Sequence, residues 1–461
     1  MSSPPSATAS YTTYLLPFSA RELLHCCQQL PGSALIYSGT SGQQQAARPC
    51  WAVLAYAPTR VLSASNDHQW RQLKQALEAD QIKAASANPA TPDNEGFISG
   101  WMGYFSYAAG CWTVAGIHPS DNRSTQSQPP HPLAEFHYYP HSLLLDFAED
   151  TVMLRSPRPC TETECGAILE QLNQARARCI TNSNTTDTTD TYQWQPQWDA
   201  SEYQQAFNQV QNYIVSGDVY QVNLTMPFRC HDNLTAISPA KLLEQFDAPF
   251  SCYFRGQSLT LFSVSPERFV KIHQQHMVTS PIKGTSPRGK TASEDLANRQ
   301  WLADSKKNQA ENLMIVDLLR NDLGRSAVTG SVQVEKMFDI ESHANVHHMV
   351  STIRAEIKPE ISPLEAVLNA FPGGSITGAP KKRAMEIIRE LEPDSRGLYC
   401  GSFGYFSDQG VADFNILIRS VVATPSGAEC WAGGGVVKDS TAAGEYDELF
   451  SKVQQLLDTI S

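Results

Sequence analysis

The sequence predicts a large composite protein in which β-sheets and helices are mixed, and three observations lead to this fold class. The chain has 461 residues, more than one hydrophobic core usually supports, so two subdomains or one composite domain are expected. Its 41% hydrophobic and 18% charged residues can bury a sizeable core. Short apolar runs separated by turns occur together with segments of helical periodicity, which indicates sheets flanked by helices.

A polar stretch at residues 181–197 divides the chain. It reads TNSNTTDTTDTYQWQPQ and has neither helical nor strand periodicity, so we expect a linker there. The division leaves an N-terminal region, residues 1–180, and a C-terminal region, residues 198–461. Apolar runs typical of strands precede the linker at residues 34–38, 52–56 and 142–147.

Three helices are predicted in the C-terminal region. Apolar residues recur at helical spacing over residues 446–460, which predicts an amphipathic helix packed on the core. A second helix is expected over residues 294–323, broken or bent near Lys306 and Lys307. A third begins at Pro380, whose fixed φ suits a first helical turn.

Charge and cysteine content exclude several classes of protein. The 35 basic and 47 acidic residues give a net charge of −12, which argues against a general nucleic-acid binder. An anionic substrate then requires a local positive site or a metal. The 11 cysteines form no CxxC pair, a pattern typical of a reducing cytoplasm. Neither a signal peptide nor a membrane span is predicted.

The segment PIKGTSPR, residues 281–288, is expected to place Lys283 inside a tight turn after an apolar strand. Most lysines are solvated surface cations, which is the alternative interpretation. A lysine that is partly desolvated, or lies near another cation, can instead act as a nucleophile. Lys283 is therefore a candidate nucleophile.

Two pairs of polar residues have i, i+3 spacing on predicted helices, Asn308 with Glu311 and Glu445 with Glu448. This spacing puts both members of a pair on one helical face. Each pair alone is compatible with a solvated face. If the two pairs meet across a cleft, their carboxylates suit Mg²⁺, which binds one or two carboxylates together with water and substrate.

Two glycine-rich stretches, FPGGSITGAP at residues 371–380 and AGGGV at residues 432–436, are expected to form loops. Backbone N–H groups in such loops bind carboxylates or phosphates. Neither stretch matches a phosphate-binding or dinucleotide-binding motif. Ordinary turns are the alternative.

Together these segments resemble the chorismate-utilising enzymes, and within them the branch of p-aminobenzoate and folate biosynthesis that aminates chorismate at C4. The similarity is dense from residue 203 onward. It includes GDVYQVNL (217–224), SPERF (265–269), PIKGTSPR (281–288), ENLMIVDLLRNDLGR (311–325), VHHMVS (346–351), FPGGSITGAPKKRAMEII (371–388), GYF (404–406), IRS (418–420) and AGGGVVKDS (432–440).

The resemblance implies an α+β fold of the anthranilate synthase component I type, a composite two-subdomain body of antiparallel-rich sheets packed together and flanked by helices. The N-terminal region is less similar, with GWMGYF (100–105) and LIYSG (35–39) as its best matches. In relatives this region can hold a tryptophan-type ligand. Ser38 is a candidate for that pocket, with a strand-end serine as the alternative.

The resemblance also implies a magnesium site. Glu311 and Glu448 would bind Mg²⁺, and Glu445 would assist through a metal-bound water. Asn308 stands where relatives have an acidic residue, so we expect weaker Mg²⁺ binding. Residues that surround the metal ligands tune metal affinity by about 10- to 100-fold.

Binding roles for chorismate follow from the same resemblance. Tyr405 and Arg419 would hold the enolpyruvyl carboxylate, and the backbone N–H groups of Gly433 and Gly435 would bind the ring carboxylate. Five further residues would contact the substrate elsewhere: Gln221, Gly284, Thr285, His348 and Ser375. Without the motif, His348 would be interpreted as a satisfied core histidine.

The implied chemistry involves Glu267 and Lys283. Glu267 would be the general acid for the C4 hydroxyl, which requires a raised pKa; an exposed ion pair with Arg268 or another cation is the alternative. Lys283 would add at C2 as the hydroxyl leaves, and ammonia would then attack C4 to give 4-amino-4-deoxychorismate. Whether Lys283 forms the bond or only steers ammonia stays open.

Two positions separate the branches of the family. Anthranilate synthases have alanine at the position of Lys283, and isochorismate and salicylate synthases have a lysine base at the position of Gln221. The chain has no Gly-Xaa-Cys-Xaa-Gly turn, so a glutamine amidotransferase subunit is expected to supply ammonia. Anthranilate synthase component I is the alternative enzyme, and a noncatalytic ligand-binding protein is the alternative of another class.

Overall fold

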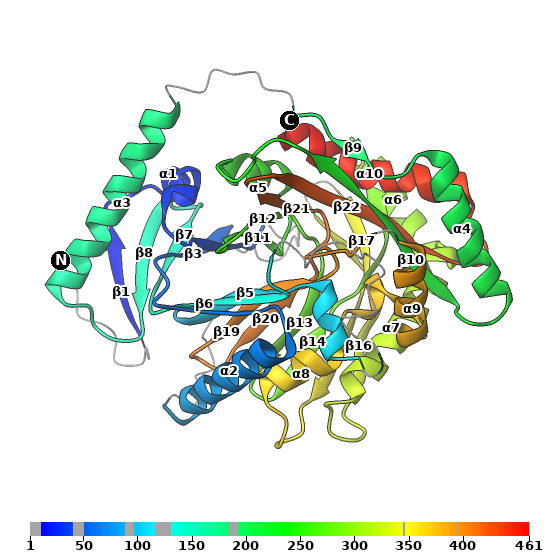
Figure 1. Ribbon diagram of the computed structural model, residues 1–461, viewed down its shortest axis with the longest axis horizontal. Coiled ribbons are helices and arrows are strands. Elements are labelled where there is room, and N and C mark those ends of the chain that lie inside the picture. Colours follow the sequence, from blue (N-terminus) through cyan, green and yellow to red (C-terminus); the bar gives the residue numbers. More distant parts are fainter. Residues whose placement is uncertain are drawn as a thin grey trace.

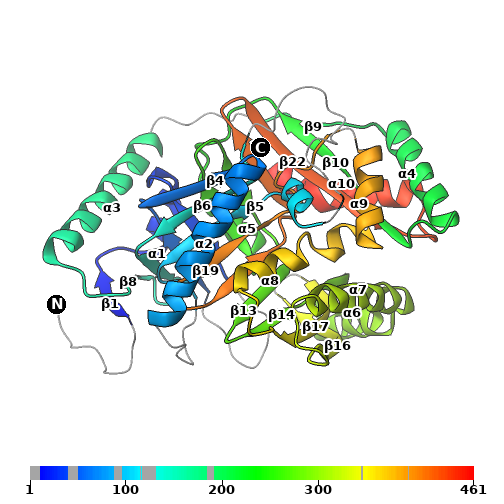
Figure 2. The same ribbon diagram turned by 60° about the horizontal axis from the view of Figure 1, so that its bottom comes forward.

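Two large sheets pack face to face and helices cover their outer faces (Figures 1 and 2). This computed structural model describes residues 11–39, 50–87, 96–114, 116, 131–183, 192–343, 346–392 and 394–460. The predicted mixture of antiparallel sheets and helices is confirmed.

The first sheet has 12 strands among the described residues, and its neighbouring strands are antiparallel where the register is defined. In spatial order they are β1 (Thr12–Leu16), β8 (Thr151–Ser156), β7 (Ser142–Asp146), β3 (Trp51–Ala55), β2 (Ala34–Tyr37), β11 (Ser251–Arg255), β12 (Thr260–Ser263), β21 (Ser420–Thr424), β22 (Gly427–Val436), β10 (Gln221–Cys230) and β18 (Gly378–Ala379), with β9 (Gln195–Pro196) paired to β10.

The second sheet has 10 strands among the described residues. In spatial order they are β15 (Ile282–Pro287), β17 (Val346–Glu356), β14 (His276–Thr279), β13 (Arg268–His273), β20 (Ala412–Asn415), β19 (Ser402–Ser407), β5 (Gly100–Phe105), β6 (Ala134–Tyr139) and β4 (Arg60–Ala64), with β16 (Gln333–Ser342) paired to β17.

Helices contribute apolar side chains to a core on the outer face of each sheet, because each sheet face must bury its apolar residues against another layer. Those on the first sheet are α1 (Ala20–Cys26), α3 (Glu162–Ser183), α4 (Ala200–Val215), α5 (Ala240–Phe246), α9 (Lys381–Leu391) and α10 (Ala442–Ile460). Those on the second are α2 (Asp67–Ala87), α7 (Lys306–Gly324) and α8 (Pro363–Ala370), while α6 (Ala292–Asp304) packs on β15 and β17.

Strands from before and after the predicted linker share both sheets. β2 pairs with β11 in the first sheet, and β5 pairs with β19 in the second. Residues 1–180 and 198–461 therefore do not form separate sheets. Within the stretch 181–197, residues 181–183 end α3 and residues 195–196 form β9, whereas residues 184–191 lie outside the described part. None of the described helices is long and apolar enough to cross a membrane.

The predicted helices are confirmed, with physical reasons at their ends. Ser305 separates α6 from α7, and its hydroxyl accepts a hydrogen bond from the Asn308 N–H as the N-cap of α7. Pro380 directly precedes α9. The terminal helix α10 buries Leu449, Val453 and Leu456.

Two predicted loops are strands. Lys283 lies in β15, which pairs with β17, and not in a tight turn. Residues 432–436 form the end of β22. This strand pairs with β10, and Val436 lies opposite Val222 as the first pair of the register. Glycine and proline content predicted turns here, but pairing with a distant strand overrode that local preference.

Candidate active site

A cavity of about 580 Å³ lies between the ends of the two sheets and is lined by β10, β15, β17, β22, α7 and α10. Most of the residues singled out from the sequence line it. They are Gln221, Glu267, Lys283, Gly284, Thr285, Asn308, Glu311, His348, Ser375, Arg419, Gly433, Gly435, Glu445 and Glu448. Segments more than 200 residues apart in the chain thus meet in one place.

Lys283 lies at an irregularity of β15. The register of β15 on β17 shifts between Ile282 and Thr285, and Gly284 has φ +85°, a conformation that favours glycine. Burial lowers the pKa of Lys283, while the charge of Glu267 acts in the opposite direction. Burial therefore favours the neutral amine, the nucleophilic form.

Glu267 follows β12 in the segment that leads into β13 and is 7% exposed. Burial raises its pKa, partly offset by the hydrogen bond from Ser375 and by the charge of Lys283. The Ser375 Oγ donates to Glu267 Oε1 at 2.8 Å. A raised pKa favours the protonated carboxyl that a general acid requires. Arg268, the predicted alternative partner, instead pairs with Asp413 at 3.0 Å.

An uncompensated cation faces the cavity. Burial lowers the pKa of Arg419, yet a guanidinium stays charged at neutral pH, and no ion pair joins it to a carboxylate among the described residues. A buried unpaired charge is costly. An anionic ligand in the cavity would remove that cost.

His348 is a residue of β17 and lies near Arg419 in the cavity. Its Nδ1 and the Thr285 Oγ1 are 2.9 Å apart and hydrogen-bonded. Burial, followed by electrostatic interaction with His343 and with the charge of Arg419, lowers the pKa of His348 to about 4. The ring is therefore neutral at pH 7 and offers one donor and one acceptor.

The glycines of β22 present backbone to the cavity. β21 pairs with β22 only as far as Cys430, so among the described residues those that follow Cys430 have no strand partner on that edge. Gly433 O accepts a hydrogen bond from Lys452 Nζ at 2.9 Å. Because the N–H and C=O of a strand residue point to the same edge, the N–H groups of Gly433 and Gly435 face away from β10.

Close packing explains why glycine occupies these positions. A Cβ on Gly433 would lie 2.2 Å from Leu224 O, and one on Gly435 would lie 2.7 Å from Gln221 Nε2. The Gln221 Nε2 is buried and has no hydrogen-bond partner among the described residues. Its N–H donors are available to a ligand.

Three carboxylates line the cavity from two helices, Glu311 from α7 and Glu445 and Glu448 from α10. A Cβ on Gly434 would lie 2.7 Å from Glu445 Oε2 and 3.8 Å from Glu448 Oε1, so both carboxylates face β22. Burial raises the pKa of Glu445. Burial also opposes ionisation of Glu448, but the nearby lysines, foremost Lys452 at 2.7 Å, outweigh it and lower its pKa.

These carboxylates fit Mg²⁺ in the chemistry of their donor atoms. Within the described ranges, no three His, Cys, Asp or Glu side chains are grouped closely enough to enclose a metal by themselves. Mg²⁺ does not require this, because it keeps several waters and usually binds one or two carboxylates plus substrate. Lys307, 3.8 Å from Glu311, and Lys452 partly balance the negative charge.

Two residues predicted from the sequence are not among those that line the cavity. Tyr405 points from β19 into the core between the sheets, with its ring 5.5 Å from that of Phe97. Ser38 exchanges hydrogen bonds with the backbone of Trp51 at the end of β2. Residues 40–49 beside it lie outside the described part, so the tryptophan-type pocket stays a prediction.

Sequence reasoning missed several cavity residues. Tyr399 lines the cavity in place of Tyr405, stacked on Trp431 with ring centroids 6.0 Å apart and planes at 14°. Lys307 and Lys452 also line it. Lys452 follows Glu448 by one helical turn, a spacing that could have indicated it. Tyr399 lies in a turn, where no periodicity marks it.

Comparison with known proteins defines the class. Residues 32–458 match the chorismate binding enzymes, so the chain belongs to this family. It is 36% identical over 450 residues to aminodeoxychorismate synthase component 1 of Escherichia coli, covering 93% of both chains. It is 46% identical over 289 residues to the Salmonella typhimurium protein of the same name, covering 61% of this chain and 63% of that relative.

Solved structures show the same fold. Anthranilate synthase component I from Streptococcus pneumoniae superposes with a TM-score of 0.72 at 23% identity, covering 90% of this chain and 94% of the other. The menaquinone-specific isochorismate synthase of Escherichia coli superposes with a TM-score of 0.68 at 16% identity, covering 98% and 94%. The anthranilate synthase component I type of fold is thereby confirmed.

Proposed function

We propose that the protein aminates chorismate at C4 to give 4-amino-4-deoxychorismate, a step toward p-aminobenzoate and folate. The observation that carries this proposal is the meeting of Lys283 and Glu267 in one cavity, where burial favours the neutral amine and the protonated carboxyl. The names of the two bacterial relatives support the same reaction.

In the proposed first step, Lys283 Nζ bonds to C2 of chorismate, both ring double bonds shift by one bond and the C4–O bond breaks. Glu267 gives its proton to the leaving hydroxyl, so water departs. In the second step ammonia bonds to C4, both double bonds shift back and the C2–N bond to Lys283 breaks. The Glu267 carboxylate then takes a proton from the new amino group, which regenerates the acid.

Binding of the two substrate carboxylates is assigned to opposite parts of the cavity. The guanidinium of Arg419, which forms no ion pair with the described carboxylates, suits a bidentate contact with one substrate carboxylate. The N–H groups of Gly433 and Gly435 on the open edge of β22 suit the other. His348 and Ser375 lie nearer to Thr285 and Glu267, where they would contact the ring substituents.

Magnesium is proposed as the cofactor, held by Glu311 and Glu448 with Glu445 nearby. It would supply positive charge for a substrate carboxylate. Asn308, three residues before Glu311, adds no charge to this group, which supports the expectation of weak metal binding.

A separate glutamine amidotransferase subunit is the proposed source of ammonia. The relatives are named as component 1 of their synthases, and this chain contains no nucleophile turn of the glutaminase type. The isolated chain should then work with ammonium salts at alkaline pH, where free ammonia is abundant, and should not use glutamine.

The test is incubation with chorismate, Mg²⁺ and ammonium, followed by chromatographic identification of the product with and without an aminodeoxychorismate lyase. The expected product is 4-amino-4-deoxychorismate, which the lyase converts to p-aminobenzoate. Anthranilate as the sole product would instead establish the second candidate function, which the similarity to a cyanobacterial anthranilate synthase component I-like protein favours. Isochorismate alone would overturn both.

A further inference from the structure

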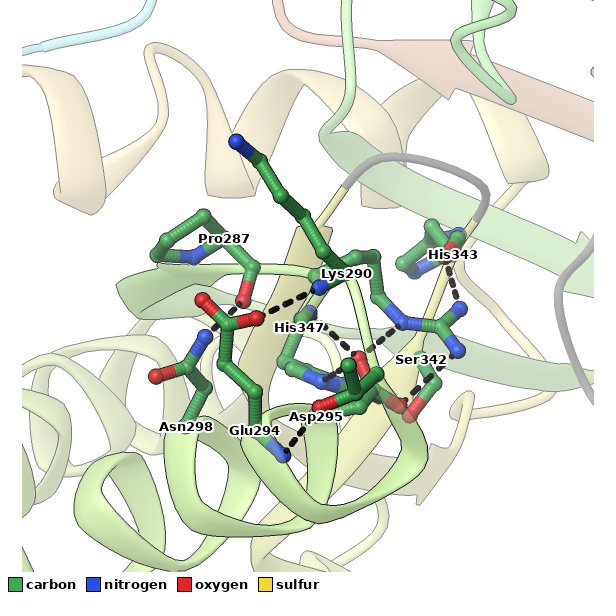
Figure 3. A network of polar contacts seen from close by, with 11 residues as sticks. Pro287, Lys290, Glu294, Asp295, Asn298, Ser342, His343 and His347 are labelled. Carbon is green, nitrogen blue, oxygen red and sulfur yellow. Dashed lines mark hydrogen bonds and ion pairs between the residues drawn. The ribbon is translucent and has the colours of Figure 1, made fainter.

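A polar network lies on the α6 side of β15, and the carboxylate of Asp295 is its centre (Figure 3). Asp295 accepts two hydrogen bonds from Arg288, with Nε–Oδ1 at 2.7 Å and Nη2–Oδ2 at 2.9 Å. It also accepts the Gly289 N–H at 2.8 Å and His347 Nε2 at 3.0 Å. One side chain of α6 thereby joins the end of β15 to β17.

The order Ser342, His347, Asp295 resembles the hydrogen-bonded chain of a hydrolase triad. Ser342 Oγ is 2.8 Å from His347 Nδ1, and His347 Nε2 reaches Asp295. However, His347 is 0% exposed, so no substrate can reach it. Arg288 already neutralises Asp295, which weakens the support a triad aspartate gives to a protonated imidazole. The network is therefore not a second catalytic centre.

Strand alternation links this network to the cavity. His347 pairs with Ser286, and the next residue, His348, pairs with Thr285. Successive side chains of a strand point to opposite faces, so His347 meets α6 while His348 meets the cavity with Thr285. Whatever holds His347 and Arg288 also fixes the place of the cavity-facing pair.

The irregularity in β15 makes this anchoring important. The shift between Ile282 and Thr285 leaves Lys283 and Gly284 outside the regular pairing. Their position then depends on how the strand is held on either side. On one side Ile282 pairs with Val350. On the other, the strand continues to Pro287, and Arg288 and Gly289 are fixed by Asp295.

We infer that Asp295 is a positioning residue, which sets the place of Lys283 and of the Thr285–His348 pair without touching the substrate. This inference rests on the function proposed above, in which Lys283 is the nucleophile. A misplacement of about 1 Å costs about 100-fold in rate. Arg419, Gly433 and Gly435 lie outside the β15–β17 pair, so loss of the network should spare carboxylate binding.

The decisive variant is Asp295→Asn, which keeps the size of the side chain and removes the charge that holds Arg288. We expect kcat for ammonium-dependent amination to fall about 10- to 100-fold, with KM for chorismate changed less than about threefold. The conservative Asp295→Glu should restore kcat to within about threefold of the parent. The matched control is Asp317→Asn on α7, whose exposed carboxylate pairs with Arg320 at 3.2 Å; its kcat and KM should be unchanged.

Hydrogen–deuterium exchange gives a readout that is independent of activity. Amides of residues 282–289 should exchange faster in Asp295→Asn than in the parent or in Asp317→Asn, while peptides of β10 and β22 should not change. Should Asp295→Asn not fold, Ser342→Ala, which removes only the outer hydrogen bond to His347, is expected to lower kcat about two- to threefold with unchanged KM.

The outcomes separate this inference from the function on which it rests. An unchanged kcat in Asp295→Asn, or a rise in KM at constant kcat, overturns the positioning role. Full C4-amination activity in Lys283→Ala overturns the nucleophile role of Lys283 on which the inference rests, whereas anthranilate or isochorismate as the sole product overturns the proposed function itself. In either case faster exchange at residues 282–289 would still identify Asp295 as the anchor of β15.

Discussion

The two walls of the cavity differ in what they offer. β10 and β22 of the first sheet contribute backbone and close-packed glycines, with the carboxylates of α10 beside them. β15 and β17 of the second sheet contribute Lys283, Thr285 and His348, which can react or exchange protons. Glu267 lies in the segment that connects β12 of one sheet to β13 of the other. In the proposed function, this difference divides substrate binding and chemistry between the two sheets.

Lys283→Ala should have the largest effect and tests the wall of the cavity that β15 and β17 form. Without the amine no bond to C2 can form, so we expect kcat to fall at least about 10³-fold. Intact-mass measurement with chorismate in the absence of ammonia should show an adduct in the parent and none in the variant. The exposed Lys241 of α5 provides a control, since Lys241→Ala should behave as the parent. An adduct on another residue would remove Lys283 from the mechanism.

Glu267→Gln should lower kcat about 10²-fold or more, because general acid catalysis contributes about 10²–10⁴-fold. In the proposed mechanism the rate depends on protonated Glu267 and neutral Lys283. It should therefore rise with pH as Lys283 loses its proton and fall as pH passes through the raised pKa of Glu267. In the variant the falling limb of the pH–rate profile should disappear. A retained alkaline limb would assign that limb to another group.

Glu267→Gln should lower the rate but raise the stability of the fold at neutral pH. Burial raises the pKa of Glu267 in the folded chain, so above pH 4.5 the unfolded state releases its proton more readily and folding is disfavoured. Glu267→Gln should thus raise the Tm at pH 7 and leave it little changed at pH 4. A lower Tm at pH 7 would show that the ionised carboxylate stabilises the fold.

Arg419→Lys tests the binding role and should raise KM for chorismate about 10- to 100-fold, since hydrogen bonds to charged groups contribute about 1.5–3 kcal/mol. Lysine keeps the charge but loses the planar bidentate contact. We expect kcat to stay within about threefold. Steady-state kinetics over a range of chorismate concentrations separates the two constants. A fall in kcat at constant KM would place Arg419 with the reacting groups.

Asn308→Asp should have the smallest effect, a decrease of about three- to tenfold in the Mg²⁺ concentration for half-maximal activity. The added carboxylate lies one helical turn before Glu311 on the same face. Titration of activity with Mg²⁺ measures the change, and Glu311→Gln should shift it in the opposite direction by about 10- to 100-fold. Equal Mg²⁺ requirements in Asn308→Asp and the parent would mean that residue 308 does not face the metal.

Local patterns predicted the regular elements well. The helix of residues 446–460 follows from apolar spacing, and the break expected near Lys306 and Lys307 lies at Ser305 between α6 and α7. Lys283 and the glycines of residues 433–435 were misplaced in loops, because glycine signals a turn only when no distant strand pairs with it. Tyr405 was assigned to the substrate from the resemblance alone, and the structure places it in the core between the sheets, because the face on which a strand side chain lies depends on the register of the whole sheet.

By itself, the sequence determined which chemical groups the protein carries: a lysine in a glycine-bounded segment, an acid sixteen residues before it, and acidic pairs at helical spacing. Only the tertiary structure decided their environment. It brought Lys283 and Glu267 into one cavity, left Arg419 without a carboxylate partner within the described part of the chain, and put Asp295 behind β15 in contact with Arg288 and His347. The reason is physical: pKa, desolvation and position depend on contacts between segments far apart in the chain, and no local pattern encodes them.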